Sequence, residues 1–400
     1  MGWGAPWVVQ SLACGFMLLL LARRPTHWDV WQAAYAAVWT TGVLAIARIA
    51  GAEQRIFYST DQATQVELLA RVQERGISLD FSSLQDGRYA VVLPAWVLTT
   101  FGLDPLLAFK FIQAVTLTFL YRLCRDWLER QGIAPRLWHT LAYAGPLFVF
   151  LSVLGLRDLV LAYAATHWFV GRSPVLRAIW LGVTLTLRPH LVAALLAGWV
   201  AAALWARLRV LHTRVGTQPL ALLGLTLAAW AAGAYSYGIL GLLKYDLAYH
   251  SPSVWWQHVW WRFFANLVGL QFLTFGDDVV AMSILQLVAL RVVFVDTLVI
   301  PILFLSTLPW AWLRHSVLRV QVYASFVYFL GLVAQTRFNS SRQNLPFFAI
   351  MGLIALVGWR DLRASTTVEA ADTVGNADAA RTVGNADAAD PRRDATAGVA

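Results

Sequence analysis

The most constraining feature of this sequence is a succession of long apolar runs separated by single arginines. About 20 apolar residues are needed to cross a bilayer as a helix, and only 13% of the chain is charged, against about 25% in soluble proteins. The sequence therefore predicts an all-α, polytopic integral membrane protein with about eleven transmembrane helices, within a range of about nine to thirteen. The predicted spans cover residues 2–22, 30–50, 104–121, 138–156, 158–171, 175–187, 190–206, 219–242, 292–313, 320–336 and 345–359.

The arginines predict how the chain is oriented in the membrane. Fifteen of them fall in every second short connection, and an excess of basic residues marks the cytoplasmic side. We therefore predict a multi-pass protein, of the plasma or inner membrane if bacterial, with a cytoplasmic C-terminus. The fifteen are Arg23, Arg24, Arg122, Arg125, Arg130, Arg136, Arg172, Arg177, Arg207, Arg209, Arg214, Arg314, Arg319, Arg360 and Arg363.

The formal net charge of +9 does not indicate a nucleic-acid partner. Basic residues spaced singly between apolar runs do not form the continuous patch that follows a phosphate backbone. The last segment, 364–400, repeats the sequence TVGNADAA and holds six acidic and three basic residues without an aromatic one. Such a composition cannot bury a core, so we expect a disordered cytoplasmic tail behind a single transmembrane domain of residues 1–363.

Two longer connections are predicted on the outer face. The first, 51–89, is polar, with a helical stretch around residues 62–74. The second, 243–291, carries paired aromatic residues that favour the headgroup layer, either as a membrane-anchoring belt or as a surface that contacts a lipid substrate. The residues predicted to contact lipid are Trp255, Trp256, Trp260 and Trp261.

Ionisable residues at the outer ends of the spans are the candidate functional residues, because charge in a membrane is costly. Arginines with acids on one face suit an anionic substrate, since a guanidinium binds phosphate oxygens bidentately. Asp61, between a membrane span and a helix, is the strongest single candidate. The wider set is Glu53, Arg55, Asp61, Arg157, Asp158, Arg188, His190, Asp277, Asp278, Arg291, Asp296, Arg337, Asn339 and Arg342.

Structural roles compete with functional ones at each of these positions. Asp61 and the pair Arg157–Asp158 suit helix capping, and Arg188 before Pro189 suits a simple turn. Arg337 and Arg342 suit side chains that reach the interface. His190 suits an interfacial histidine better than a base, and the Asp277–Asp278 pair suits an N-cap better than a cation site.

The order of several short motifs resembles the multi-spanning glycosyltransferases of the GT-C superfamily, which use polyprenyl-phosphate-linked mannose or arabinose donors. The motifs are the acid in the first outer loop, Tyr89 to Pro94, Phe101 to Pro105, the sequence Gly155-Leu156-Arg157-Asp158 followed by Leu187-Arg188-Pro189, and Ser341 to Pro346. They cover residues 50–206 and 335–359, and only their order is characteristic.

The resemblance implies transfer of a sugar from a polyprenyl-phosphate donor to a lipid or glycan acceptor at the outer face of the bilayer. Asp61 matches the loop acid that serves as catalytic base, and Arg55, Arg157, Asp158, Arg188, His190, Arg337 and Arg342 are the predicted substrate-binding residues. A single Asp61 replaces the usual acidic pair, so a divalent cation (Mg²⁺ or Mn²⁺) stays open as a cofactor and no metal ligand is assigned.

Two other functions stay open. An O-antigen or exopolysaccharide polymerase would need the arginines of its outer loops and not Asp61. The other is a transporter or flippase for an anionic lipid-linked glycan; transporters often have internal repeats and broken helices near the middle of the membrane, and the two halves of this sequence show no convincing repeat. The expected position of the charges at the outer rim argues against transport.

Overall fold

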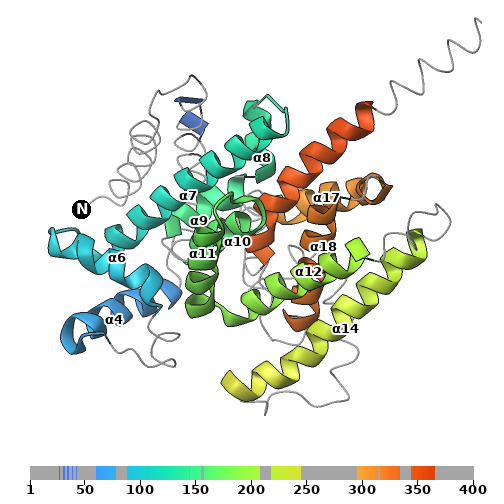
Figure 1. The fold of residues 1–400 in the computed structure, drawn as a ribbon. Helices are drawn as coiled ribbons and strands as arrows, with labels where there is room; N and C mark the ends of the chain where they lie inside the picture. Colours follow the sequence, from blue (N-terminus) through green and yellow to red (C-terminus); the bar gives the residue numbers. More distant parts are fainter. Residues whose placement is uncertain are drawn as a thin grey trace, which may run out of the picture.

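The computed structural model describes residues 60–77, 88–134, 136–143, 145–154, 157–207, 218–244, 295–313, 316–333 and 344–364, and seven single residues between 27 and 42. Throughout these ranges the regular structure is helical, without a strand (Figure 1). The all-α prediction is therefore confirmed for the part of the chain that is described. The predicted span 2–22, the aromatic segment beyond residue 244 and the tail after residue 364 lie outside it.

Helices follow one another along the described chain, joined by short turns wherever both neighbours are described. They are α4 (Thr60–Arg75), α6 (Tyr89–Thr100), α7 (Pro105–Arg130), α8 (Leu137–Tyr143), α9 (Pro146–Leu154), α10 (Asp158–Val170), α11 (Pro174–Leu187), α12 (Pro189–Arg207), α14 (Gln218–Lys244), α17 (Asp296–Leu313), α18 (Val317–Val333) and a last helix, Leu345–Ala364, drawn in red in Figure 1.

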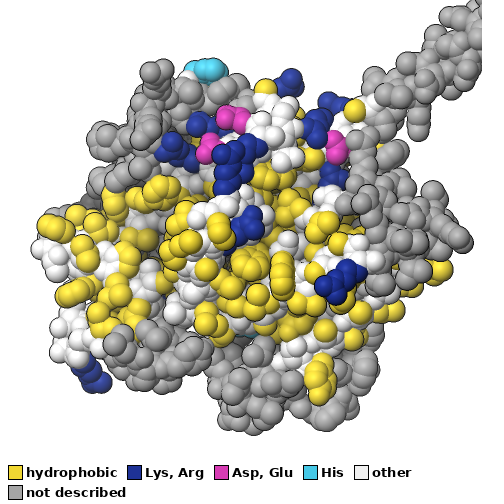
Figure 2. Space-filling view, in the orientation of Figure 1, with side chains coloured by type: hydrophobic (Ala, Val, Ile, Leu, Met, Phe, Trp, Pro, Cys, Tyr) yellow, Lys and Arg dark blue, Asp and Glu magenta, His cyan; other side chains and the backbone are white. Residues whose placement is uncertain are grey.

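Four of the described helices are long and apolar enough to cross a membrane: Pro105–Arg130, Pro189–Arg207, Pro219–Ser236 and Leu345–Ala364. A broad hydrophobic band also covers the described surface below a cluster of charged side chains (Figure 2). These are the features of a helical membrane protein. The described residues do not support the predicted count of eleven spans, because helices such as α10, with 13 residues, reach only about 20 Å at 1.5 Å per residue.

Local sequence explains where the better-defined helices begin. The Asp104 carboxylate accepts hydrogen bonds from the amides of Leu106 and Leu107, at 2.9 and 3.2 Å, and Pro105 occupies the first helical position of α7. Ser173 and Pro174 start α11 in the same way. A capping side chain followed by proline is a strong start signal, because proline lacks the amide that would otherwise need a partner.

Two predicted boundaries were wrong. Helix α7 continues to Arg130, so Arg122, Arg125 and Arg130 lie on a helix instead of in a connection. Arginine is a good helix former whose apolar stem packs against a helix while its charge stays near water. The predicted span 138–156 is broken between α8 and α9 around Gly145.

A further helix, α6, was not predicted, because 12 residues with an internal Pro94 resemble an apolar turn.

Side-chain contacts define two opposite ends of the bundle. At one end, Arg130 of α7 donates to the Val170 carbonyl at the end of α10, and Arg360 of the last helix donates to the Gln131 carbonyl. These three helices therefore run parallel, and α18 runs against them, because Arg319 near its start pairs with Asp361 at 3.1 Å. We call this the arginine-rich end, and the other, where α10 starts, the Asp158 end.

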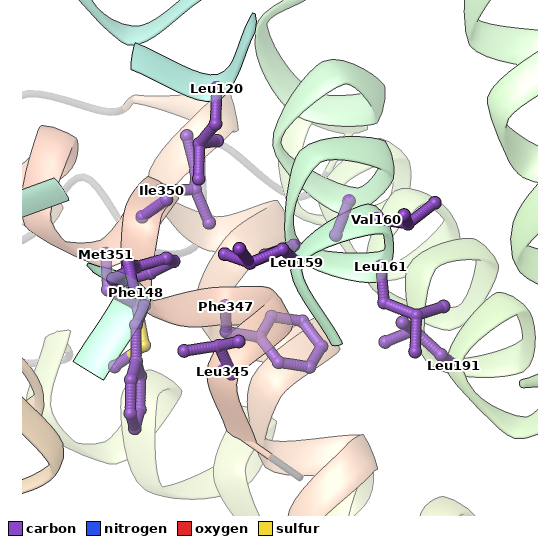
Figure 3. Close-up of a cluster of buried hydrophobic side chains, with 14 of the residues drawn as sticks. Leu120, Phe148, Leu159, Val160, Leu161, Leu191, Leu345, Phe347, Ile350 and Met351 are labelled. Carbon is purple, nitrogen blue, oxygen red and sulfur yellow. The ribbon is translucent and has the colours of Figure 1, made fainter. Parts of the chain in front are cut away.

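The hydrophobic core lies between α7, α9, α10, α12, α18 and the last helix. In Figure 3, Leu159 of α10 points toward the last helix, near Phe347 and Ile350, while Leu161 points toward Leu191 of α12. Helix α10 is buried on almost all sides, which explains why its apolar residues show no helical periodicity. Its first residue, Asp158, is therefore carried into the interior.

Gly352 allows the last helix to pack directly on α8. A Cβ built at this position would overlap the Ala142 carbonyl. We expect Gly352→Ala to lower the free energy of unfolding by about 1–3 kcal/mol, because backbone must move to accept the methyl group. Thermal unfolding of the detergent-solubilised protein measures this.

Gly182→Ala in α11 is the matched control, because a Cβ there meets nothing within 4 Å. Alanine at an open helical position should leave stability unchanged or raise it by up to about 1 kcal/mol. Equal melting temperatures for the Gly352 variant and the wild type would show that the helices do not pack this closely.

Candidate functional site

The Asp158 end holds a buried ion pair between two residues predicted to bind substrate. Arg188 Nη2 lies 3.5 Å from Asp158 Oδ1. Asp158 is fully buried and Arg188 is 6% exposed. Both were expected at the outer ends of helical hairpins, and both lie at helix ends, but they are buried: Asp158 begins a helix that the core surrounds, and Arg188 lies between α11 and α12. A charge held this deeply needs its partner, because desolvation of an isolated ion costs several kcal/mol.

Arg157 and His190 flank this pair. Arg157 Nη1 donates to the Leu187 carbonyl at the end of α11, at 2.9 Å. A guanidinium at a helix C-terminus satisfies a carbonyl that has no partner within the helix and is attracted by the helix dipole. The His190 ring stacks on Phe329 of α18, with centroids 5.9 Å apart. The structure thus brings together Arg157, Asp158, Arg188 and His190, from the helix ends that meet here.

The sequence placed Arg157 next to Asp158 as a local cap, and that interpretation was incomplete. Arg157 occupies the N-cap position of α10 without a side-chain capping hydrogen bond. The ionic partner of Asp158 is instead Arg188, 30 residues away. The pair therefore joins two helical hairpins and does more than close one turn.

Asp61 lies in the first turn of α4, since this helix starts at Thr60. The predicted helix in the outer loop is therefore confirmed, while the surroundings of the Asp61 side chain lie outside what the structure describes. Helix α4 packs on α6 and on α7, and Gln73 in its last turn donates to Thr99 Oγ1 at the end of α6. Since α7 runs parallel to α10, these contacts place α4 toward the Asp158 end.

Asp296 is a second buried acid among the described residues. It is 4% exposed at the start of α17, and its Oδ2 accepts the amide hydrogen bond of Leu147 at 2.9 Å. This carboxylate satisfies the start of α9 where α8 and α9 separate. A Cβ built at Gly145 would approach the same oxygen to 2.5 Å, so glycine lets the acid reach the break.

Asp296→Ala should lower the free energy of unfolding by about 1–3 kcal/mol, because a buried amide of α9 loses its acceptor. Asp296→Asn keeps a carbonyl oxygen that can accept the same bond, and we expect it to recover at least half of the loss. Thermal unfolding of the two variants in detergent compares them. An alanine variant as stable as the wild type would show that α9 does not depend on this cap.

Sequence reasoning missed several buried polar residues on α7 and α4. Gln113 is fully buried, and neither of its side-chain polar atoms has a hydrogen-bond partner among the described residues. Lys110, one turn earlier on the same face, is 4% exposed, and Gln65 of α4 is also buried. The sequence signal that could have identified these residues was a lysine and a glutamine inside an apolar run, because burying either side chain in a membrane costs free energy.

Several predicted site residues lie outside the described part of the chain. They are Glu53, Arg55, Asp277, Asp278, Arg291, Arg337, Asn339, Arg342 and the four tryptophans Trp255, Trp256, Trp260 and Trp261. Within the part that is described, His, Cys, Asp and Glu side chains do not gather in threes as a metal site would require.

The chain was also compared with known proteins. No protein family, curated protein sequence or solved structure matches it.

Proposed function

We propose that this protein is a membrane glycosyltransferase, which moves a sugar from a polyprenyl-phosphate-linked donor to a lipid or glycan acceptor. The observation that carries the proposal is the meeting of Arg157, Asp158, Arg188 and His190 at one end of an apolar helical bundle. Guanidinium groups held at helix ends in a low-dielectric environment are suited to a lipid-borne phosphate.

The location of this cluster also supports a lipid-linked substrate. The cluster lies at the Asp158 end, opposite to Arg130, Arg319 and Arg360. Helix α4, which carries Asp61, also packs toward the Asp158 end. If the arginine-rich end is cytoplasmic, as the positive-inside rule predicts, the cluster faces the outer leaflet, and we propose that Asp61 at the start of α4 lies on the same side. A polyprenyl donor would then reach them from the bilayer without crossing water.

In the proposed reaction the acceptor hydroxyl oxygen attacks the anomeric carbon of the donor sugar. The new glycosidic bond forms as the bond between that carbon and the phosphate oxygen breaks, and polyprenyl phosphate leaves with the bonding electrons. Asp61 accepts the proton of the acceptor hydroxyl. The Arg157 and Arg188 guanidiniums stabilise the charge that develops on the leaving phosphate.

Transport of an anionic lipid-linked glycan is the second candidate, and one observation favours it. Helices α8 and α9 form a broken helix whose second half starts at a buried carboxylate, Asp296. Discontinuous helices with buried polar groups occur at the substrate sites of transporters. A transporter would leave its cargo chemically unchanged, whereas the proposed enzyme makes a new glycosidic bond.

The proposal is tested by deleting the gene in its native host and comparing the envelope glycans and lipid-linked sugars of the deletion and parent strains. We expect the deletion strain to lack one glycosidic linkage and to accumulate its unsubstituted acceptor. Re-expression of the gene should restore the linkage. Shorter polymers with every linkage intact would support a polymerase instead, and unchanged glycans would contradict both enzymatic functions.

A further inference from the structure

Three arginines surround the turn between α10 and α11 at the arginine-rich end. Arg130 Nη2 donates to the Val170 carbonyl at 3.5 Å, and Arg177 Nε donates to the Gly171 carbonyl at 2.7 Å. Arg172 comes directly after these two residues in the turn, and its charge acts on Arg130. Three positive charges are therefore held in one place against their mutual repulsion.

Three other arginines of this end pair with carboxylates, whereas Arg130, Arg172 and Arg177 form no ion pair within the described part of the chain. Arg319 and Arg360 both pair with Asp361, at 3.1 and 2.8 Å, and Arg125 pairs with Glu129 at 3.7 Å. In the described part of the chain, Arg130 and Arg177 donate to backbone carbonyls instead of carboxylates, and Arg172 is exposed. The two acids nearest to Arg130 in the sequence, Glu129 and Asp126, lie 3.7 and 3.9 Å from Arg125. An excess of positive charge remains at the turn.

The same turn offers two further features that favour an anion. Helix α11, with 14 residues, starts here at Ser173 and Pro174, so the positive end of its dipole faces the arginines. His167 is 94% buried, and its Nδ1 has no hydrogen-bond partner among the described residues. Its ring lies against Gly171, where a Cβ would overlap it, and Arg177 acts on it electrostatically. An unsatisfied imidazole therefore faces the turn.

Apolar surface continues from this charged turn along α11. Val175, Leu176 and Ile179 are all exposed, in the first two turns after Ser173. Figure 2 shows basic side chains gathered above a hydrophobic band of the described surface. A free anion in water would not contact this apolar surface. A phospholipid, in contrast, can place its phosphate at the charged turn and its acyl chains on the exposed apolar side chains of α11.

We propose that Arg130, Arg172, Arg177 and the start of α11 form a binding site for the phosphate of an anionic phospholipid, with its acyl chains against Val175, Leu176 and Ile179. The site is separate from the Asp158 end and does not depend on the proposed enzymatic function. With the arginine-rich end in the cytoplasm, it would use the anionic lipids of that leaflet.

The test is a binding titration of the full-length, detergent-solubilised protein, in which binding is monitored by the change in tryptophan fluorescence. The probes are phosphatidylglycerol, phosphatidylcholine and soluble glycerol 3-phosphate. We expect phosphatidylglycerol to bind most tightly. Arg172→Gln should weaken it about five-fold, as expected for about 1 kcal/mol per basic residue near a membrane surface.

Arg363→Gln is the matched control, because Arg363 is an exposed arginine at the end of the last helix, where Arg360 contacts α7. It should leave the affinity within about two-fold of the wild type. Ile179→Asn should weaken phosphatidylglycerol binding and leave glycerol 3-phosphate binding unchanged. Thermal unfolding of each variant confirms that it is folded.

Three results would overturn the proposal. Equal affinity for phosphatidylcholine and phosphatidylglycerol would show that the protein does not recognise the anionic headgroup. Equal weakening by the Arg172 and Arg363 variants would show a diffuse surface charge in place of a site. Glycerol 3-phosphate binding as tightly as phosphatidylglycerol would assign the turn to a free phosphate compound instead of a lipid.

Discussion

Asp158→Ala should lower the free energy of unfolding of this protein by about 3–5 kcal/mol, one of the two largest effects that we expect. The substitution leaves the Arg188 guanidinium, 6% exposed, without the carboxylate that lies 3.5 Å away. An uncompensated buried charge costs more than the ion pair itself contributes. Thermal or denaturant-induced unfolding of the detergent-solubilised protein measures the loss.

The double variant Asp158→Leu/Arg188→Met removes both charges and keeps similar volumes. We expect it to be within about 1 kcal/mol of the wild type, because an apolar pair avoids the desolvation cost. It also separates structure from function: if Arg188 binds the donor phosphate, the double variant is folded but inactive. A double variant as unstable as Asp158→Ala would contradict the ion-pair explanation.

Asp61→Asn should reduce sugar transfer by about 10²–10⁴-fold, the usual contribution of a general base. An amide has nearly the shape of the carboxylate but cannot accept the proton of the acceptor hydroxyl. The measurement is the initial rate of product formation in membranes that contain equal amounts of wild-type and variant protein. The affinity for the donor should change much less than the rate.

Glu67→Gln provides the control for this experiment. Glu67 lies on the same helix, is exposed, and pairs with Arg71 one turn away at 3.9 Å. Its substitution should leave the transfer rate within about two-fold of the wild type, since a surface ion pair is worth little. If Asp61→Asn transfers at the full rate but unfolds more easily, the acid serves only the start of α4, an effect of about 0.3–1 kcal/mol.

The sequence predicted the helices well because membrane segments are read from local composition. Long apolar runs anticipated α12, α14 and the last helix, and the polar helix of the first loop was also expected. Neither the end of α7 at Arg130 nor α6 with its Pro94 follows from hydropathy, because an arginine-bearing helix end and a short apolar helix both resemble connections.

The parts of the site that escaped prediction depend on contacts between residues distant in the sequence. The break between α8 and α9 needs Asp296, 149 residues beyond the amide that it caps, and the close approach at Gly352. Burial of Asp158 depends on the helices that surround α10 and on Arg188. Composition identified Asp158 and Arg188 as costly residues, but their pairing depends on how two helical hairpins pack against each other.

The most direct test of the proposed enzyme uses the purified full-length protein in liposomes that contain polyprenyl phosphate carrying a radiolabelled sugar, together with lipid extract from the native host as the acceptor source. We predict that label moves from polyprenyl phosphate to a new lipid or glycan product, at a rate that Asp61→Asn lowers by about 10²–10⁴-fold. Label that stays on polyprenyl phosphate while the intact donor crosses the bilayer would contradict it and assign transport to the broken helix at Asp296.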